Sequence, residues 1–268
     1  MCSQPGALLA QGTDLGAVTV LRNEPAIRRT DRVELKLLGG FELLVGGRDL
    51  ELNAGGQRLL AFLALRRRPI LRTLAAGTLW PDGSDRRASA NLRSVLWRLH
   101  RFGVPLVAAE HGRLRLADLV DVDLRRASEL ARDLVTRATD PGLIDSWRML
   151  AADLLPDWDE DWVGDDREHF HQLRLHGLEA ATAELAGLRR FSEALEAALV
   201  AVAAEPLRES AHRAVIAVHL AEGNAAQAIL QYGRCERLFA TELGIPPPSE
   251  MRDSIEEVMV GRSSSASL

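Results

Sequence analysis

The chain has 268 residues, of which 47% are hydrophobic and 26% charged, a composition typical of a globular protein with room for two domains. Charges interrupt its apolar runs well before the roughly 18 residues that a membrane span requires, and no signal peptide is recognisable. Two cysteines, Cys2 and Cys235, are too few for a disulfide framework. We therefore expect a cytoplasmic protein with no membrane contact.

The net charge of -5 conceals an uneven distribution. Residues 31–116 contain 15 Lys+Arg and 8 Asp+Glu, a net charge of +7, whereas residues 117–260 contain 14 Arg and 28 Asp+Glu, a net charge of -14. Lys36 is the only lysine, so arginine is favoured throughout, as in GC-rich genomes, and arginine content alone is weak evidence. The contrast nevertheless predicts a basic domain and an acidic domain with separate tasks.

The first half predicts a winged helix-turn-helix domain over residues 31–116. Residues 1–30 show no sustained periodicity, and we expect a flexible extension there. Alternating hydrophobic residues between 33 and 52 predict a small antiparallel sheet. Helices are predicted over residues 57–65 and 71–80 and from residue 86 onward, followed by a β-hairpin over residues 104–116. The order of sheet, three helices and hairpin wing is typical of domains that place the third helix on DNA.

The third helix carries an apolar stripe at helical spacing, formed by Leu92, Val95, Leu96 and Leu99. The residues off this stripe are the candidates for DNA contact. On the helix they are Arg86, Arg87, Ser89, Asn91, Arg93, Ser94, Trp97, Arg98 and Arg101, and in the hairpin they are Arg113 and Arg115.

These candidates suit different contacts. Arg93 and Arg98 suit guanine edges, and Asn91 suits adenine if it faces outward, whereas residues at the helix start suit phosphates. The spacing does not decide which of them reads bases, and packing of Trp97 against the protein or a partner remains an alternative. The hairpin arginines either touch the DNA backbone or minor groove or simply occupy an exposed turn. Residues 66–68, three arginines after the first helix, have three open roles: phosphate contact, sigma-factor contact or a favourable interaction with the helix dipole.

The second half, residues 117–260, predicts an all-α domain. Helices are expected over residues 123–138, 143–154, 168–188, 188–204, 206–221 and 249–260. Residues 190–195 and 224–229 repeat at an offset of 34, the period of tetratricopeptide helix pairs. The fold is therefore predicted as mainly α, with a winged helix-turn-helix followed by a tetratricopeptide-like domain. Residues 261–268 are expected to form a disordered tail.

An acidic stretch over residues 157–168 places carboxylates at positions 1, 3, 5 and 12 of a calcium loop. Position 6 of such a loop requires glycine for a sharp turn, and Trp162 stands there. A surface loop anchored by Trp158 and Trp162 is the better interpretation. No histidines and cysteines stand at zinc spacing, and no catalytic arrangement stands out, so we expect no metal, no cofactor and no enzyme activity.

Several motifs occur together in a distinctive order. They are residues 57–65 (QRLLAFLAL), 79–80 (LW), 91–101 (NLRSVLWRLHR), 154–158 (LLPDW), 161–163 (DWV), 174–179 (RLHGLE), 206–212 (PLRESAH), 219–223 (HLAEG) and 242–245 (ELGI). In these the chain resembles the Streptomyces antibiotic regulatory proteins (SARP), in which an OmpR-type winged helix precedes a bacterial transcriptional activation domain. The resemblance implies binding to repeats in promoter DNA, contact with RNA polymerase and its sigma factor, and a homodimer at least on DNA.

The function expected is therefore a sequence-specific transcriptional activator, in the family's case often of secondary metabolism. Two alternatives remain open. One is a repressor gated by a small effector in the helical domain, and the other is a helical-repeat scaffold that binds proteins. A P-loop ATPase module is not expected, because Lys36 cannot supply the lysine of that motif.

Overall fold

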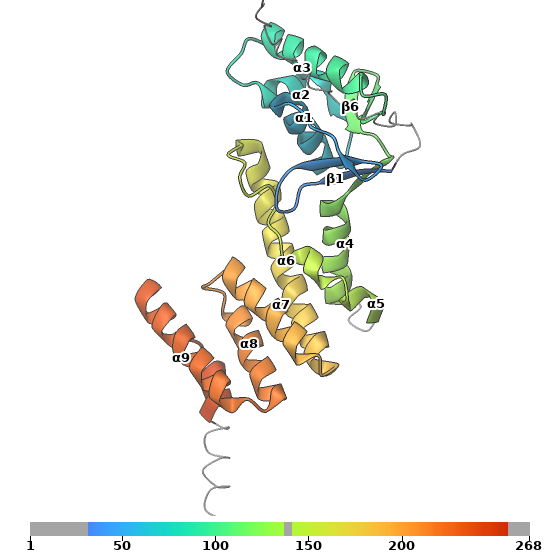
Figure 1. The fold of residues 1–268 in the computed structure, drawn as a ribbon. Coiled ribbons are helices and arrows are strands. Elements are labelled where there is room, and N and C mark those ends of the chain that lie inside the picture. The colour runs from blue at the N-terminus through green and yellow to red at the C-terminus, as the bar shows by residue number, and fades with distance from the viewer. Residues whose placement is uncertain (1–31, 137–140, 257–268) are drawn as a thin grey trace, which may run out of the picture.

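The computed structural model describes residues 32–136 and 141–256, so the predictions for residues 1–30 and 261–268 lie outside the described residues. Figure 1 shows a mixed α/β part at the N-terminal end of the described chain, joined to a series of helices that continues to its C-terminal end. No helix within the described ranges is both long and apolar enough to cross a bilayer.

The first sheet has the strand order β3-β2-β1-β7. Its strands are β1 (Val33–Lys36), β2 (Glu42–Val45), β3 (Arg48–Asp49) and β7 (Val120–Val122). The first three pair antiparallel, as predicted, but β7 adds to β1 in parallel, with Val33 opposite Val120. Alternation across each strand turns Val33, Leu35, Val120 and Val122 into the core. The sheet thus uses a strand from beyond residue 116.

The three predicted helices of this part are confirmed. They are α1 (Ala54–Leu65), α2 (Arg72–Leu79) and α3 (Asp85–His100). The α1 helix begins three residues before the predicted start at 57, because the Asn53 side chain caps it by accepting a hydrogen bond from the Gly56 amide at 2.9 Å. The second sheet, β4-β6-β5, contains β4 (Ile70–Leu71), β5 (Val107–Glu110) and β6 (Arg113–Leu116) and includes the predicted hairpin.

The rest of the described chain is helical. The elements are α4 (Asp123–Thr136), α5 (Pro141–Ile144), a 3-10 turn η1 (Trp147–Leu150), α6 (Asp161–Gly187), α7 (Phe191–Ala204), α8 (Glu209–Glu222) and α9 (Ala225–Glu242), followed by helical residues at 249–256. The repeat at an offset of 34 is confirmed as structural, because Arg190 and Asn224 immediately precede α7 and α9. Gly223, with φ of 85°, ends α8 in the left-handed conformation.

The single helix predicted over residues 143–154 is wrong. The chain there makes only α5 and η1, and then forms a bridge between Leu154 and Leu38 of the first domain. Trp147 and Leu150 are both buried and stand three residues apart, a spacing that also occurs on the buried side of an α-helix. The Arg174 side chain is buried and donates hydrogen bonds to the carbonyls of Leu150 and Ala151. These carbonyls therefore bond to a side chain of α6 instead of to backbone amides of a continuing helix.

The acidic stretch is also different from the expected loop. The α6 helix begins at Asp161 rather than at residue 168, with a carboxylate in its first turn, where the helix dipole favours negative charge. Trp158 stacks on Phe41 with ring centroids 6.0 Å apart, and Trp162 meets Phe62 edge-on at 5.4 Å. Both tryptophans are half-buried and pack against the first domain, so the stretch joins the two halves.

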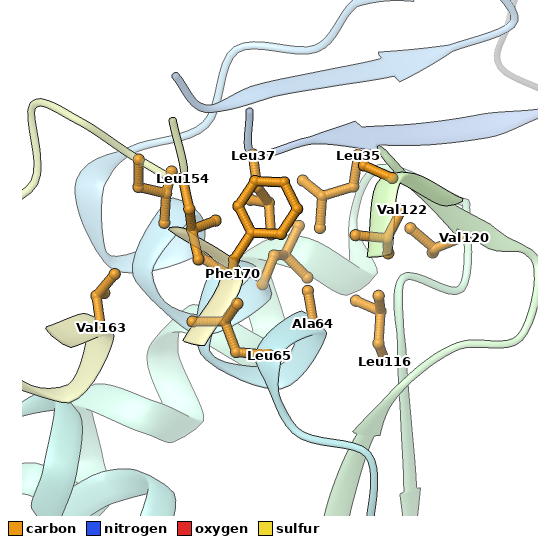
Figure 2. Packing of buried hydrophobic residues seen from close by; sticks show 14 of the residues in the cluster. Leu35, Leu37, Ala64, Leu65, Leu116, Val120, Val122, Leu154, Val163 and Phe170 are labelled. Carbon is orange, nitrogen blue, oxygen red and sulfur yellow. The ribbon is translucent and has the colours of Figure 1, made fainter. Parts of the chain in front are cut away.

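One continuous hydrophobic core crosses this junction. Figure 2 shows Leu35 and Leu37 of the sheet beside Ala64 and Leu65 of α1 and Phe170 of α6. Asp123, at the start of α4, accepts hydrogen bonds from the amides of Leu37 and Leu38 at 2.9 and 3.1 Å. Burial raises the pKa of Asp123, although these amides oppose the shift. The two parts therefore pack as one unit rather than as beads on a flexible linker.

Candidate nucleic-acid interface

The α3 helix is oriented by its apolar stripe. Ala88, Leu92, Val95 and Leu99 are buried, which leaves the opposite side of the helix in solvent. Leu96, predicted as part of this stripe, is half-buried. The helix follows the Trp80–Pro81 stop and is capped by Ser84, whose hydroxyl accepts a hydrogen bond from the Arg87 amide at 3.4 Å.

The solvent side of α3 carries a line of exposed cationic and aromatic residues. Arg86, Arg93, Trp97 and Arg101 are separated by seven, four and four residues, so they share one side of the helix. Trp97 is 60% exposed, and the Arg101 guanidinium lies over its ring, 5.0 Å from the centroid. Trp97 does not pack into the protein core. The line therefore presents planar groups and positive charge to solvent.

The arginines of α3 have no acidic partners in the part of the chain that the structure describes. Asp85 is the only acidic residue on the helix, at its N-terminal end. The ion pairs nearest in sequence are those of Arg66 with Asp166 and of Arg115 with Asp118. Because no carboxylate neutralises it, the face keeps the positive charge that a phosphate backbone attracts.

The remaining predicted helix residues flank this line. Arg87, Ser94 and Arg98 are exposed, whereas Ser89 and Asn91 are half-buried. The structure thus brings all nine helix candidates onto or beside one surface. Asn91 is therefore less accessible than Arg93 and Arg98.

The wing arginines differ from each other. The hairpin turns at His111 and Gly112, whose φ values of 49° and 74° suit a tight left-handed turn. Arg113 is exposed beside this turn and donates a hydrogen bond to the Pro69 carbonyl at 3.1 Å. Arg115 is half-buried and forms an ion pair with Asp118. Arg113 is therefore the more accessible of the two.

The structure also adds residues that the sequence analysis did not single out. A groove of about 390 Å³ beside the C-terminal end of α3 is lined by Asn53 and by Arg98, and a second groove of about 340 Å³ lies between α3 and β5. Arg72 and His100 line the second groove together with Trp97. His100 stands three residues after Trp97, so helical spacing could have pointed to it. Arg72 follows β4, which pairs with β6, and sequence spacing gives no signal that Arg72 lies beside α3.

The three arginines after α1 have separate environments. Arg66 pairs with Asp166 at 2.5 Å and lies over the Phe62 ring, 4.9 Å from its centroid, so its charge is used at the junction between the domains. Arg67 and Arg68 are exposed.

The acidic stretch shows no metal geometry. Asp161 and Glu168 lie on one helix, α6, rather than in a loop that wraps an ion. Within residues 32–136 and 141–256, no group of three or more histidine, cysteine, aspartate or glutamate side chains is placed to hold a metal.

Comparisons with known proteins identify the family of this chain. Residues 119–259 match the family model of the bacterial transcriptional activator domain. The chain is 25% identical over 250 residues to regulatory protein AfsR of Streptomyces griseus, covering 88% of this chain and 25% of the relative. It is 27% identical over 239 residues to regulatory protein AfsR of Streptomyces coelicolor, covering 83% of this chain and 24% of the relative. The chain spans about a quarter of the length of these relatives.

Among solved structures, the chain is similar to EmbR of Mycobacterium tuberculosis, determined in complex with a low affinity phosphopeptide. The TM-score is 0.68 at 21% identity, with 86% of this chain and 66% of that chain covered, and this shows a shared fold. The family match alone covers more than half of the chain. The chain therefore belongs to the bacterial transcriptional activator domain family, which confirms the predicted resemblance to the Streptomyces antibiotic regulatory proteins.

Proposed function

We propose that this protein binds promoter DNA through α3 and the β5–β6 wing and activates transcription by recruiting RNA polymerase. The observation that carries the proposal is the unneutralised arginine line on the solvent side of α3. A helix with one apolar side packed on its domain and one cationic side in solvent is what major-groove readers present to DNA.

The residue roles follow from position. We assign guanine edges to Arg93 and Arg98, midway and late in the helix, because a guanidinium group can donate two hydrogen bonds to one guanine. Arg86 and Arg87 lie in the first turn, where their charge adds to the exposed backbone amides and suits phosphate oxygens. Arg113 extends this contact to the wing.

The partners proposed are double-stranded promoter DNA, RNA polymerase with its sigma factor, and a second copy of the chain on repeated sites. The fixed junction between the domains supports recruitment, because a rigid second domain holds its surface at a defined place relative to the bound DNA. A DNA-binding regulator of this kind acts in the cytoplasm and needs no catalytic site.

A salt titration of the full chain on promoter fragments tests DNA binding. Affinity for a specific promoter should fall by about 0.9 log units per log unit of salt for each phosphate neutralised. Replacing both Arg86 and Arg87 with alanine should reduce that slope and weaken binding to all sequences alike. The matched control is the double substitution of Arg234 and Arg237, two exposed arginines on α9 far along the chain. Binding that is indifferent to sequence, or equal weakening by the control, would contradict the proposal.

Transcription with purified polymerase distinguishes activation from repression. An activator raises the transcript yield from the bound promoter, whereas a repressor lowers it at the same occupancy. A chain that binds neither promoter nor polymerase but retains a protein partner would instead be a scaffold.

A further inference from the structure

A cavity of about 530 Å³ lies at the junction of the two domains, away from the exposed face of α3. Its walls come from the segment after α1, the end of β6, the α4 helix and the α6 helix. Six arginines line it: Arg66, Arg67, Arg68, Arg115, Arg125 and Arg132. The volume falls within the range of about 300–1,000 Å³ that small-molecule sites occupy.

The charge in this cavity is not balanced. Two carboxylates on its wall are already used, because Asp166 pairs with Arg66 and Asp118 pairs with Arg115. The other four arginines make no ion pair with any described residue, and Glu129 is the one carboxylate left among the lining residues. The cavity therefore carries an excess of positive charge, although Arg125, Glu129 and Arg132 belong to the acidic half of the chain.

The arginines converge from two elements. Arg67 and Arg68 follow α1, whereas Arg125 and Arg132 stand seven residues apart on α4 and so share one side of that helix. Arg132 is half-buried, which removes part of its hydration and strengthens its attraction for an anion. Guanidinium groups match phosphate oxygens with two parallel hydrogen bonds.

The floor of the cavity is apolar. Leu65, Leu116 and Phe170 line it and belong to the core that crosses the junction, where Figure 2 shows them together. Cationic walls over an apolar floor suit a ligand that has a multiply charged anionic group and a less polar body.

We propose that this cavity binds a small phosphorylated metabolite of two or more negative charges, held between the winged domain and α4. Anionic groups of the ligand pair with the arginines that have no carboxylate partner among the described residues. The ligand thereby links the segment after α1 to the helical domain. This inference is independent of DNA binding, because none of its four unpaired arginines lies on α3 or at the tip of the wing.

Titration calorimetry of the full chain with inorganic pyrophosphate and with adenosine diphosphate tests the site. We expect saturable binding of one ligand per chain and a rise in melting temperature, because a ligand that binds only the folded state stabilises it. The double variant R68Q/R125Q should bind about tenfold more weakly or worse, since each wall loses a positive charge and the charge-assisted hydrogen bonds that it makes. The double variant R234Q/R237Q removes the same charge outside the cavity and should bind as the parent protein does.

Circular dichroism and the ligand-free melting temperature establish that both variants fold. Absence of saturable binding to either probe overturns the proposal, as does equal weakening by the two double variants. A cavity variant that loses promoter affinity while keeping its pyrophosphate affinity would show a DNA-contacting surface and would also overturn it. Tighter binding of adenosine diphosphate than of pyrophosphate would support a role for the apolar floor.

Discussion

The arginines of the helical domain and those of α3 have different environments. In the helical domain many are held by carboxylates, as in the pairs Arg174–Asp153, Arg190–Glu193 and Arg208–Glu179. On α3 the arginines have no such partners among the described residues, although the residue type is the same. In a chain with a single lysine, arginine content says little about function. The partner of each guanidinium group separates those that stabilise the fold from those available to a ligand.

The largest effect should come from the most buried arginine. Arg174 is 1% exposed, pairs with Asp153 and donates hydrogen bonds to the carbonyls of Leu150 and Ala151. Arg174→Ala should lower the free energy of unfolding by roughly 3–5 kcal/mol, because buried carbonyls lose their donors and a cavity remains. Urea denaturation measures the change.

The control for that substitution is Arg213→Ala. Arg213 pairs with Glu250 at 3.0 Å, but their side chains are 53% and 75% exposed. Arg213→Ala should therefore lower the free energy of unfolding by less than about 1 kcal/mol. If the two substitutions cost the same, burial does not explain the difference between the arginines.

The next effect should appear in DNA binding rather than in stability. Arg93→Ala should weaken specific promoter binding by roughly 1–3 kcal/mol if the side chain reads a base. The free energy of unfolding should change by no more than about 0.5 kcal/mol, because the side chain is exposed and unpaired in the described structure. Binding measured on promoter variants gives the specificity profile. An unchanged profile would remove Arg93 from the base-reading set.

A smaller effect is expected at the junction between the two halves. Glu160 pairs with Arg58 at 2.8 Å and accepts a hydrogen bond from the Trp162 indole at 2.8 Å, and both charged side chains are about a quarter exposed. Glu160→Gln should lower the free energy of unfolding by roughly 1 kcal/mol, since the amide retains an acceptor but loses the charge. The matched control is Glu42→Gln, which removes an exposed pair with Lys36. A larger loss in the control would contradict this account of the junction.

The smallest effect concerns pH. Burial acts to raise the pKa of Glu179, but hydrogen bonds from Arg208 and Ser210 outweigh it and lower the pKa below 4.5. A carboxyl group whose pKa is lower in the folded state than in the unfolded state stabilises the fold at pH values above its unfolded-state pKa. This stabilisation is lost as the pH falls through the folded-state pKa. Glu179→Gln should therefore flatten the loss of stability below about pH 4.5.

Acid titrations of unfolding by circular dichroism measure that slope. Glu242→Gln, at an exposed position near the end of α9, provides the control and should leave the slope close to that of the parent protein. A slope that Glu179→Gln leaves unchanged would show that the contact with Arg208 does not contribute to acid stability.

The regular elements were largely predictable because their signals are local. The stripe of Leu92, Val95 and Leu99 predicts both the helix and its buried side, and the repeat at an offset of 34 predicts the helix pairs. Errors arose where distant contacts override local pattern. The predicted helix over residues 143–154 is interrupted because Arg174 and the bridge to Leu38 hold its backbone elsewhere.

The candidate functional residues also divide into those that local sequence pattern predicts and those that only the fold brings together. Periodicity alone identified the outward residues of α3, and the charge of each half follows directly from composition. Sequence spacing does not reveal that β7 pairs with β1 or that Trp158 and Trp162 pack against Phe41 and Phe62 of the first domain. It also does not reveal that Arg67 and Arg125 line the same cavity. Periodicity reports on neighbours within a few residues, whereas ion pairs, parallel strand pairing and cavities depend on residues brought together from distant parts of the chain. Which arginines are neutralised is therefore a property of the folded molecule.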